Sequence, residues 1–234
     1  MKLMSFNTQH CLNYLEQKID FNIMARTIKE WDAHIVGLNE MRSFCESDSE
    51  YADQTAILSS LTGMQYYYFA EAIRFYGTKP YGNGMLSKLP IISAETVIIP
   101  DPDPKKYNGY YETRCILKAK LQGDITVLIV HMGLNPDEQE NAVKTVIEKL
   151  ADSRCILMGD FNMKPDNPLL KPIKERMIDT ADYFGEPKLS FPSDKPNRKI
   201  DYIFVSPDVE IISADIPAIV SADHRPHIAE IIMK

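Results

Sequence analysis

The sequence predicts an α/β fold built on mixed β-sheets, because short apolar runs typical of strands alternate with amphipathic runs typical of helices. A Gln122-Gly123 turn between two adjacent strand-like runs indicates an antiparallel hairpin, whereas runs separated by a helical segment require a crossover. Parallel and antiparallel pairs should therefore occur together. The 234 residues contain no repeat, long charge block or linker of biased composition, so we expect one domain over residues 1–234.

The first part of the chain is expected to alternate between the two kinds of element. Strands over residues 2–6 and 34–38 are separated by a helix over residues 20–31, where apolar side chains follow rough helical spacing. A second helix is expected over residues 51–61. The pattern then predicts a series of strands, over residues 66–70, 84–87, 91–99, 113–121 and 124–131.

The segment 136–150 has the clearest helical pattern. Asn135 is a good N-cap, Pro136 suits the first turn, and the acidic residues that follow complement the positive end of the helix dipole. Its apolar side chains form one stripe, so this helix should pack on a sheet. A Pro-rich irregular stretch extends to about residue 172, and the remaining strands are expected over residues 154–159, 200–205, 209–213 and 227–232.

Composition and charge narrow the class of protein. With 44% hydrophobic and 25% charged residues, the chain has the composition of a globular protein. No apolar run approaches the roughly 20 residues that a membrane-spanning helix needs, and the first residues turn polar too soon for a signal peptide, so we expect a cytoplasmic protein. The net charge of −7 disfavours non-specific binding to nucleic acids or anionic membranes.

Four cysteines are widely scattered and form no CxxC pair. Cys115 and Cys155 lie inside apolar strand-like runs. We therefore expect Cys11, Cys45, Cys115 and Cys155 to be free thiols rather than disulfides or a zinc site.

Polar side chains recur where strand-like runs end, which is where α/β proteins gather ligands. Taken singly, each also fits a structural role such as a turn, a cap, a solvated charge or a satisfied histidine. Asp201 is different, because it enters an apolar run and a buried carboxylate needs a partner. The residues at the ends of the runs are Asn7, Glu40, His131, Asp160, Asn162, Asp223 and His224.

Asp160 and Asn162 form a candidate pair for orienting water. If this segment stays extended, their side chains point to one face while Phe161 points to the other and anchors in the core. A carboxylate beside an amide suits a reaction in which one group accepts a proton from water and the other fixes its direction.

In combination these residues resemble the endonuclease/exonuclease/phosphatase superfamily of deoxyribonuclease I-like metal-dependent phosphoesterases. The resemblance extends over nearly the whole chain, from residue 2 to about residue 231. Residues 82–91 resemble the mid-chain strand and turn of that family, and residues 111–114 resemble the segment that supplies an arginine near the phosphate. The other matching motifs are Asn7, Glu40, His131, Gly159-Asp160-Phe161-Asn162, Ile200-Asp201-Tyr202-Ile203 and Ser221-Ala222-Asp223-His224.

The resemblance implies a four-layer α/β sandwich, in which two mixed β-sheets pack face to face with helices on the outside. It implies that Glu40 is the main ligand of a divalent metal, with Asn7 and Asp223 as nearby direct or water-mediated ligands. Mg²⁺ suits such oxygen ligands, Mn²⁺ is an alternative, and the cation would offset the repulsion between converging carboxylates.

The remaining site residues also take roles from the resemblance. Asp160 would orient or deprotonate the attacking water, and Asn162 would hold that water or the phosphate. The implied phosphate contacts are His224, which Asp201 would orient, His131 as a second hydrogen-bond donor, and Arg114. Glu71 falls where nucleases of the family place a glutamate that supports the first histidine.

The expected function is a metal-dependent hydrolase of phosphoesters, either a phosphodiesterase or a phosphatase. The acidic charge favours a small or lipid-like substrate. The alternative is a Mg²⁺-dependent endonuclease or exonuclease acting on DNA or RNA. The basic residues that could contact the backbone of such a polyanion are Lys105, Lys106, Lys195, Arg198 and Lys199. Gln9, and the absence of a Trp-containing motif before Asp201, argue against abasic-site endonuclease activity.

Two other classes are weaker. A serine or cysteine hydrolase lacks a GxSxG elbow, and Ser221, Asp223 and His224 are too close in sequence to form a triad by themselves. A non-catalytic binding module would be expected to have lost acids or histidines that are present here. No protein partner is implied, and specificity is expected to come from loops around residues 44–53, 74–81 and 100–111, the first of which carries Glu46, Asp48, Glu50 and Asp53.

Overall fold

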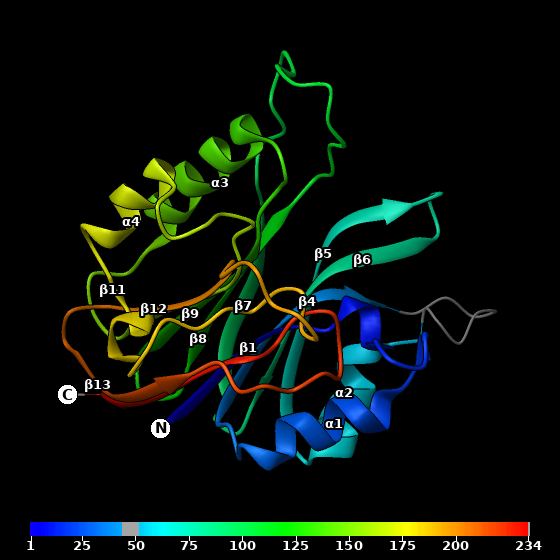
Figure 1. The fold of residues 1–234 in the computed structure, drawn as a ribbon, viewed down its shortest axis with the longest axis vertical. Coiled ribbons are helices and arrows are strands. Elements are labelled where there is room, and N and C mark those ends of the chain that lie inside the picture. The colour runs from blue at the N-terminus through cyan, green and yellow to red at the C-terminus, as the bar shows by residue number, and fades with distance from the viewer. Residues whose placement is uncertain (44–51, 234) are drawn as a thin grey trace.

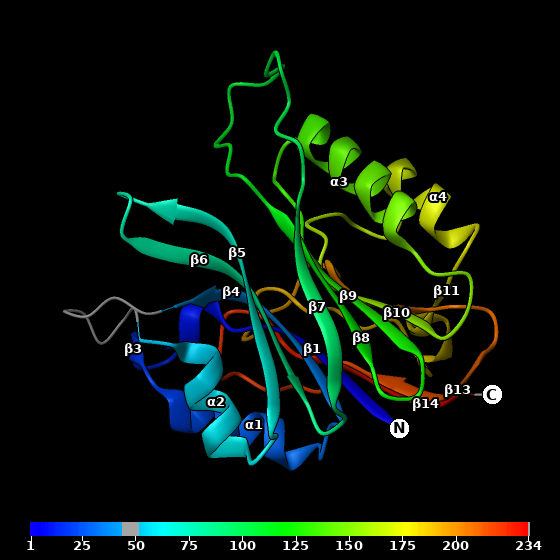
Figure 2. The same cartoon turned by 180° about the vertical axis from the view of Figure 1, so that it is seen from behind.

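A computed structural model describes residues 1–43 and 52–233. These residues form two six-stranded mixed sheets that pack face to face (Figures 1 and 2). The first sheet has the order β13-β14-β1-β4-β6-β5, and the second has the order β11-β12-β10-β9-β8-β7. The predicted α/β class with mixed pairing is confirmed.

The bounds of the strands agree with most of the predicted ranges to within a few residues. In the first sheet the strands are β13 (Val209–Asp215), β14 (His227–Met233), β1 (Lys2–Asn7), β4 (Ile35–Arg42), β6 (Lys79–Ser87) and β5 (Tyr66–Phe75). In the second they are β11 (Ile178–Asp179), β12 (Asp201–Val205), β10 (Cys155–Asp160), β9 (Ile125–His131), β8 (Cys115–Leu121) and β7 (Ile91–Ile98). A small additional pair is formed by β2 (Leu12–Asn13) and β3 (Lys18–Ile19).

The helices cover the outer faces of the two sheets (Figures 1 and 2). Asp20, the first residue of the helix predicted over residues 20–31, is instead the N-cap of α1 and accepts from the backbone N–H groups of Asn22 and Ile23. Asn135 and Glu138 form a capping box at the start of α3. The helices are α1 (Phe21–Glu30), α2 (Gln54–Thr62), α3 (Pro136–Lys149) and α4 (Lys171–Lys174), with 3₁₀ turns η1 (Gln9–Cys11), η3 (Pro168–Leu170) and η4 (Thr180–Tyr183).

Alternation along the strands produces the layers. Leu3 packs in a core between the two sheets, while its neighbour Met4 packs under α1 and α2. On the second sheet, Ile129 belongs to the core between the sheets and Leu128 packs under α3. Three cores therefore separate four layers, helix, sheet, sheet and helix, which confirms the predicted sandwich.

One predicted loop is instead a regular element. Residues 74–81 form the outer end of an antiparallel hairpin, because β5 continues to Phe75 and β6 begins at Lys79. The stretch from β7 to β8 has no helix or strand, as expected for residues 100–111.

Other expectations concern cysteines and membrane spans. Cys11, Cys115 and Cys155 are free and buried, whereas Cys45 and the acidic residues 46, 48 and 50 lie outside the described residues. Over the ranges that the structure describes, no helix combines the length and apolar character needed to cross a membrane.

Candidate active site

Strand directions bring the predicted polar residues to one edge of the sandwich. β1 runs parallel to β4, and β9 runs parallel to β10, so the carboxyl ends of each pair lie together. Asn7, His131 and Asp160 are the last residues of β1, β9 and β10, and Glu40 lies near the end of β4. β12 runs antiparallel to β10 and begins at Asp201, which is paired with Asp160 in the register.

Two buried amides join the sheets at this edge. The Nδ2 group of Asn7 donates to Glu40 Oε1 at 3.0 Å and to Asp160 Oδ2 at 3.1 Å, so one side chain holds carboxylates from both sheets. Asn39 accepts from the Asp160 backbone N–H at 2.9 Å and donates to the carbonyl of Val130 at 3.1 Å. Sequence reasoning did not select Asn39, although its place in the Leu38-Asn39-Glu40 run pointed to it.

His224 lies between two acids. Its Nδ1 atom is 2.8 Å from Asp201 Oδ2, and its Nε2 atom is 3.6 Å from Asp160 Oδ2. Burial alone would lower the pKa of His224, but Asp201 and Asp160 outweigh burial and raise that pKa to about 10. Burial also raises the pKa of Asp160, to about 7. The site thus contains a cationic imidazole beside a carboxyl group whose proton is exchangeable near neutral pH.

His131 has the opposite protonation state. Arg114 Nη1 lies 3.0 Å from His131 Nδ1, and because a guanidinium only donates, Nδ1 is the acceptor and Nε2 carries the proton. Burial and the charge of Arg114 keep the pKa of His131 well below its usual value. Nε2 faces Asp160 Oδ2 at 3.6 Å. Arg114 itself pairs with Glu112 at 2.6 Å.

The Asp160–Asn162 segment does not stay extended, which corrects the geometry expected from its sequence. Asn162 adopts a positive φ of 52°, and its backbone N–H donates to Asp160 Oδ1 at 2.9 Å. Its side-chain amide donates to the carbonyl of Met132 at 3.0 Å and lies 3.3 Å from His131 Nε2. Phe161 is fully buried beside Tyr202, so the expected anchor in the core is present.

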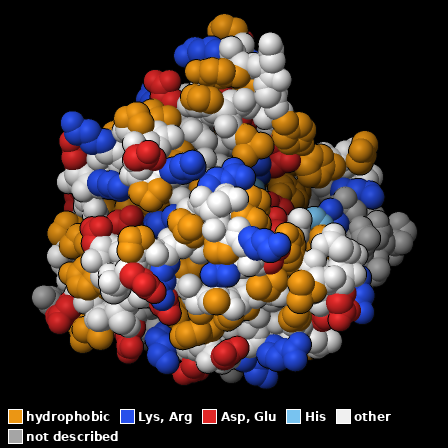
Figure 3. Space-filling model, viewed as in Figure 1, with side chains coloured by type: hydrophobic (Ala, Val, Ile, Leu, Met, Phe, Trp, Pro, Cys, Tyr) orange, Lys and Arg blue, Asp and Glu red, His pale blue; other side chains and the backbone are white. Residues whose placement is uncertain are grey.

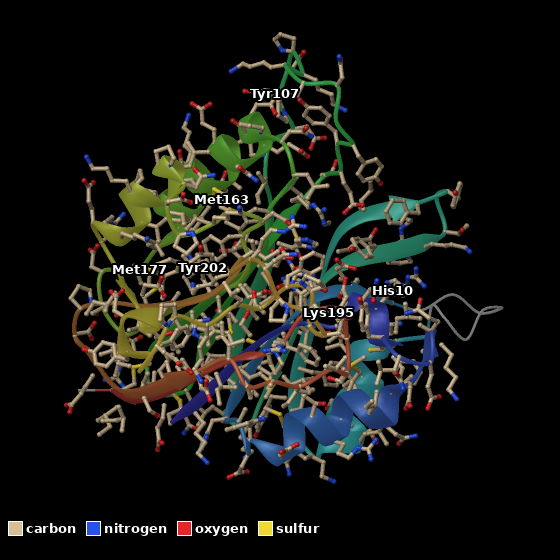
Figure 4. All side chains as sticks on the ribbon, viewed as in Figure 1. His10, Tyr107, Met163, Met177, Lys195 and Tyr202 are labelled. Atoms are coloured by element: carbon tan, nitrogen blue, oxygen red, sulfur yellow. The ribbon has the colours of Figure 1, made fainter. Side chains whose placement is uncertain are left out.

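Several backbone positions at this edge are strained. Glu40 and the consecutive residues Gln9, His10 and Cys11 have positive φ values between 47° and 64°, a region that non-glycine residues rarely adopt. Such strain persists where the surrounding structure imposes it, commonly at functional sites. His10, labelled in Figure 4, is a site residue that sequence reasoning missed, since its Nδ1 atom lies 3.9 Å from Glu40 Oε2. No pattern in the sequence distinguishes it from other histidines.

The carboxylates fit a divalent cation. The Oδ1 atoms of Asp201 and Asp223 are buried and have no hydrogen-bond partner within residues 1–43 and 52–233. Burial would raise the pKa of Glu40, but interactions with His10, Asn7 and the nearby imidazoles lower it to about 2, so this group stays anionic. Burial raises the pKa of Asp223 to about 6, with Glu40 and Asp201 adding to the shift. An excess of oxygen ligands with unpaired atoms suits a hard cation such as Mg²⁺.

A second donor set overlaps the first. The ligand atoms of Asp160, Asp201 and His224 all lie within 4.8 Å of one another. One imidazole nitrogen in this set is already hydrogen-bonded to Asp201, so the Glu40 side of the site offers the freer oxygen ligands.

Two expected roles are corrected by the structure. Glu71 lies on the β5–β6 hairpin and accepts from Arg74 Nε at 2.9 Å, so it does not support His131, whose Nδ1 contacts Arg114 instead. Lys199 is 6% exposed and lies 3.6 Å from Asp179, so it is not available to a polyanion.

The sandwich and the edge that carries these acids and imidazoles define a class of protein. Residues 4–224 match the Endonuclease/Exonuclease/phosphatase family, so the chain belongs to that family.

Solved structures share the fold. An endonuclease/exonuclease/phosphatase from Beutenbergia cavernae superimposes with a TM-score of 0.78 at 18% identity, over 100% of this chain and 71% of that one. A functionally unknown conserved protein from Enterococcus faecalis gives 0.78 at 17% identity, over 100% of both chains. A mannosyl-6-phosphatase from Bacteroides thetaiotaomicron gives 0.75 at 16% identity, over 99% of both chains. Among curated proteins, none matches the sequence.

Proposed function

We propose that this protein is a divalent-metal-dependent phosphoester hydrolase, a phosphodiesterase or a phosphatase, in which water attacks phosphorus in line. The observation that carries the proposal is the bridge from Asn7 to both Glu40 and Asp160, with His224 between Asp160 and Asp201. It combines anionic ligands, a proton acceptor and a cationic donor in one buried cluster.

Glu40, Asn7 and Asp223 would hold the metal, with Mg²⁺ as the expected ion and Mn²⁺ as a substitute. When bound, the cation polarises the phosphoryl oxygens and offsets the charge of the converging carboxylates. The unpaired Oδ1 atom of Asp223 and the anionic state of Glu40 support this assignment.

The other residues carry the proton and position the phosphate. Asp160 accepts the proton of the attacking water as the new P–O bond forms and the ester P–O bond breaks, and a pKa of about 7 suits a general base at neutral pH. Asn162 orients the water or phosphate. His224, kept cationic by Asp201, donates to a phosphoryl oxygen, and the neutral Nε2–H group of His131 is the second donor.

Arg114 acts through its neighbours in this proposal. It is paired with Glu112 and contacts His131 Nδ1, so it holds His131 in the tautomer that donates from Nε2. Its Nε group is buried and has no hydrogen-bond partner in the described part of the chain, and the direct contact with the phosphate that the resemblance implies stays a prediction.

A small phosphoester is favoured over a nucleic acid. The net charge of −7 disfavours a polyanion, and burial of Lys199 removes one of the cations that a nuclease would use. The mannosyl-6-phosphatase with the same fold has a small sugar phosphate in its name, which supports the same substrate size here. The cytoplasmic location expected from the sequence remains a prediction.

The test is hydrolysis of p-nitrophenyl phosphate, bis(p-nitrophenyl) phosphate and plasmid DNA, each with Mg²⁺, Mn²⁺ or EDTA. We expect turnover of a small ester only with metal, and its loss in Asp160→Ala and His224→Ala. His34→Ala is the matched control, because His34 lies outside the site, where its Nδ1 atom accepts from the Lys2 backbone. Full activity in both site variants would overturn the proposal, and cleavage of DNA alone would favour the nuclease.

A further inference from the structure

Two projections flank the candidate active site. We call residues 99–114 the loop arm and the outer end of the β5–β6 hairpin, residues 72–81, the hairpin arm. Both leave the sandwich on the side where β1 and β4 end, and the site lies between their bases (Figures 1 and 2). Long connections without regular structure are uncommon in compact domains and are often functional, and the loop arm is one.

The arms carry tyrosines that are unusually exposed. Tyr76, at the tip of the hairpin arm, is 91% exposed, and Tyr110 and Tyr107 of the loop arm are 62% and 47% exposed. Figure 3 shows hydrophobic side chains gathered on both projections where they border the hollow between them, and Figure 4 labels Tyr107 on the loop arm. Clustered exposed aromatic rings mark binding surfaces, because their faces lose little by stacking on a partner.

Tyr110 is held in place although its ring is exposed. Its carbonyl accepts from Asn135 Nδ2 at 2.8 Å, and its hydroxyl donates to Glu112 Oε2 at 3.2 Å. Gly109 brings the backbone against Asn135, where a Cβ atom would meet Asn135 Oδ1 at 2.1 Å. The ring is thus pre-organised, which lowers the entropy lost when a ligand stacks on it.

A short series of contacts joins Tyr110 to the reacting groups. Glu112 pairs with Arg114 at 2.6 Å, and Arg114 contacts His131 Nδ1 at 3.0 Å. On the other side, the ring centroids of Tyr81 and Phe75 lie 5.5 Å apart on the hairpin arm. Tyr81 is paired with Arg42 in the register between β6 and β4, two residues along β4 from the proposed metal ligand Glu40. Both arms therefore begin at the site.

We propose that the two arms bind a planar aromatic group carried by the substrate next to its scissile phosphate, a nucleobase being the natural example. The inference rests on the proposed phosphoester hydrolase and names its substrate class. Hydroxylated rings held by hydrogen bonds suit a flat polar ring better than a flexible acyl chain.

The experiment compares esters that differ only in the aromatic ring. Adenosine 5′-monophosphate is compared with ribose 5-phosphate, and the methyl esters of these two compounds form a second pair. Decyl phosphate is the probe with an apolar chain in place of the aromatic ring. Hydrolysis with Mg²⁺ or Mn²⁺ is followed by chromatography, and binding to the Asp160→Asn variant is followed by calorimetry. The variants are Tyr110→Ala, Tyr76→Ala and Tyr110→Phe, with Tyr183→Ala as an exposed tyrosine outside both arms.

In whichever pair the enzyme hydrolyses, we expect a higher kcat/KM for the adenosine compound than for the ribose compound. Each alanine variant should reduce that preference roughly fivefold to hundredfold, the range found for loss of one base–aromatic stack. Ribose compounds should change less than twofold, Tyr110→Phe should keep most of the preference, and Tyr183→Ala should behave as wild type. A preference for decyl phosphate that the alanine variants remove would overturn the inference in favour of an apolar chain.

Failure of the inference and failure of the proposed function give different results. Hydrolysis of both members of a pair at equal rates, unaffected by the alanine variants, would overturn the aromatic site and leave the hydrolase intact. If no ester is hydrolysed, the proposed function fails, and calorimetry still decides the inference: equal affinity for adenosine 5′-monophosphate and ribose 5-phosphate would overturn it, and loss of a preference in Tyr110→Ala would support it.

Discussion

Two clusters of buried polar side chains lie side by side around β12, and they combine charges in different ways. In the cluster around Lys199, the ammonium lies 3.6 Å from Asp179 and 3.2 Å from the ring centroid of Tyr202, and its Nζ atom has no hydrogen-bond partner in the described residues. Thr180 Oγ1 lies 2.9 Å from His227 Nε2. One cation faces one anion, and the imidazole of His227 stays neutral because burial, followed by the charge of Lys199, keeps its pKa well below the usual value.

The candidate active site concentrates like charges instead. Its four carboxylates are Glu40, Asp160, Asp201 and Asp223, and His224 is the cation that contacts them most closely. Two of their oxygens have no hydrogen-bond partner in the described ranges, and strained backbone surrounds them. Removing one partner of a buried ion pair is strongly destabilising because it leaves an uncompensated charge, and burying several like charges together carries a similar cost.

The largest expected effect separates two histidines, one from each cluster. His224→Ala should lower kcat by about 10²–10⁴-fold, the range for a positioned proton donor, while the protein stays folded. His227→Ala should leave kcat within a few-fold and lower the melting temperature, because it empties a fully buried position. Activity of the folded protein and thermal unfolding by circular dichroism measure both. Equal loss of kcat in the two variants would remove the distinction between the clusters.

The next effect is on stability. Lys199→Met should destabilise the protein by roughly 3–5 kcal/mol, because it leaves the buried Asp179 without its partner. Adding Asp179→Asn should recover most of the loss, since the uncompensated charge is then gone. Urea unfolding gives both values. If the Lys199→Met variant were as stable as wild type, the pairing of Lys199 with Asp179 would not contribute to the stability of the fold.

Metal binding should stabilise the protein through the cluster of the candidate active site and not through the cluster around Lys199. Mg²⁺ at about 100 times its Kd should stabilise wild type by about 2.7 kcal/mol, which is a rise of several degrees in melting temperature. Glu40→Gln should abolish the rise, because it removes the anionic ligand, whereas the Lys199→Met variant should keep it. A rise that persists in Glu40→Gln would place the metal elsewhere.

A smaller effect should appear as a pH dependence without metal. The pKa of Asp160 is raised from 3.8 to about 7 in the folded state, so its favourable contribution to stability is complete below the unfolded value and is lost as pH rises through about 7. Asp160→Asn mimics the protonated group and should be more stable than wild type at pH 8. The difference should shrink toward pH 4. Melting curves in EDTA measure it, and a constant difference would contradict the raised pKa.

Much of the fold follows from local pattern. The period of the apolar residues predicted α1, α3 and the central strands, since those elements bury one face or both against a neighbour. The hairpin arm was not predicted, because the run from Arg74 to Tyr81 has neither strict alternation nor a short turn motif. Its strand character depends on pairing between β5 and β6.

The site was predicted as a set of residue types at strand ends, but not as a network. Asn39 and His10 acquire their contacts only when two sheets and a strained turn meet. Glu71 and Lys199 have side chains that suit the roles expected from the sequence. In the structure, however, Glu71 accepts a hydrogen bond from Arg74, and Lys199 is paired with the buried Asp179.

By itself, the sequence determined the order of strands and helices and the inventory of acids, amides and imidazoles, because these depend on residue type and short-range spacing. Only the tertiary structure decided which of them meet. Asn7 and Asp160 are 153 residues apart and share a hydrogen bond because the two sheets pack face to face with their strand ends aligned. The protonation of His224 and His131 was decided at the same level, since it depends on burial and on which charges lie within a few ångströms.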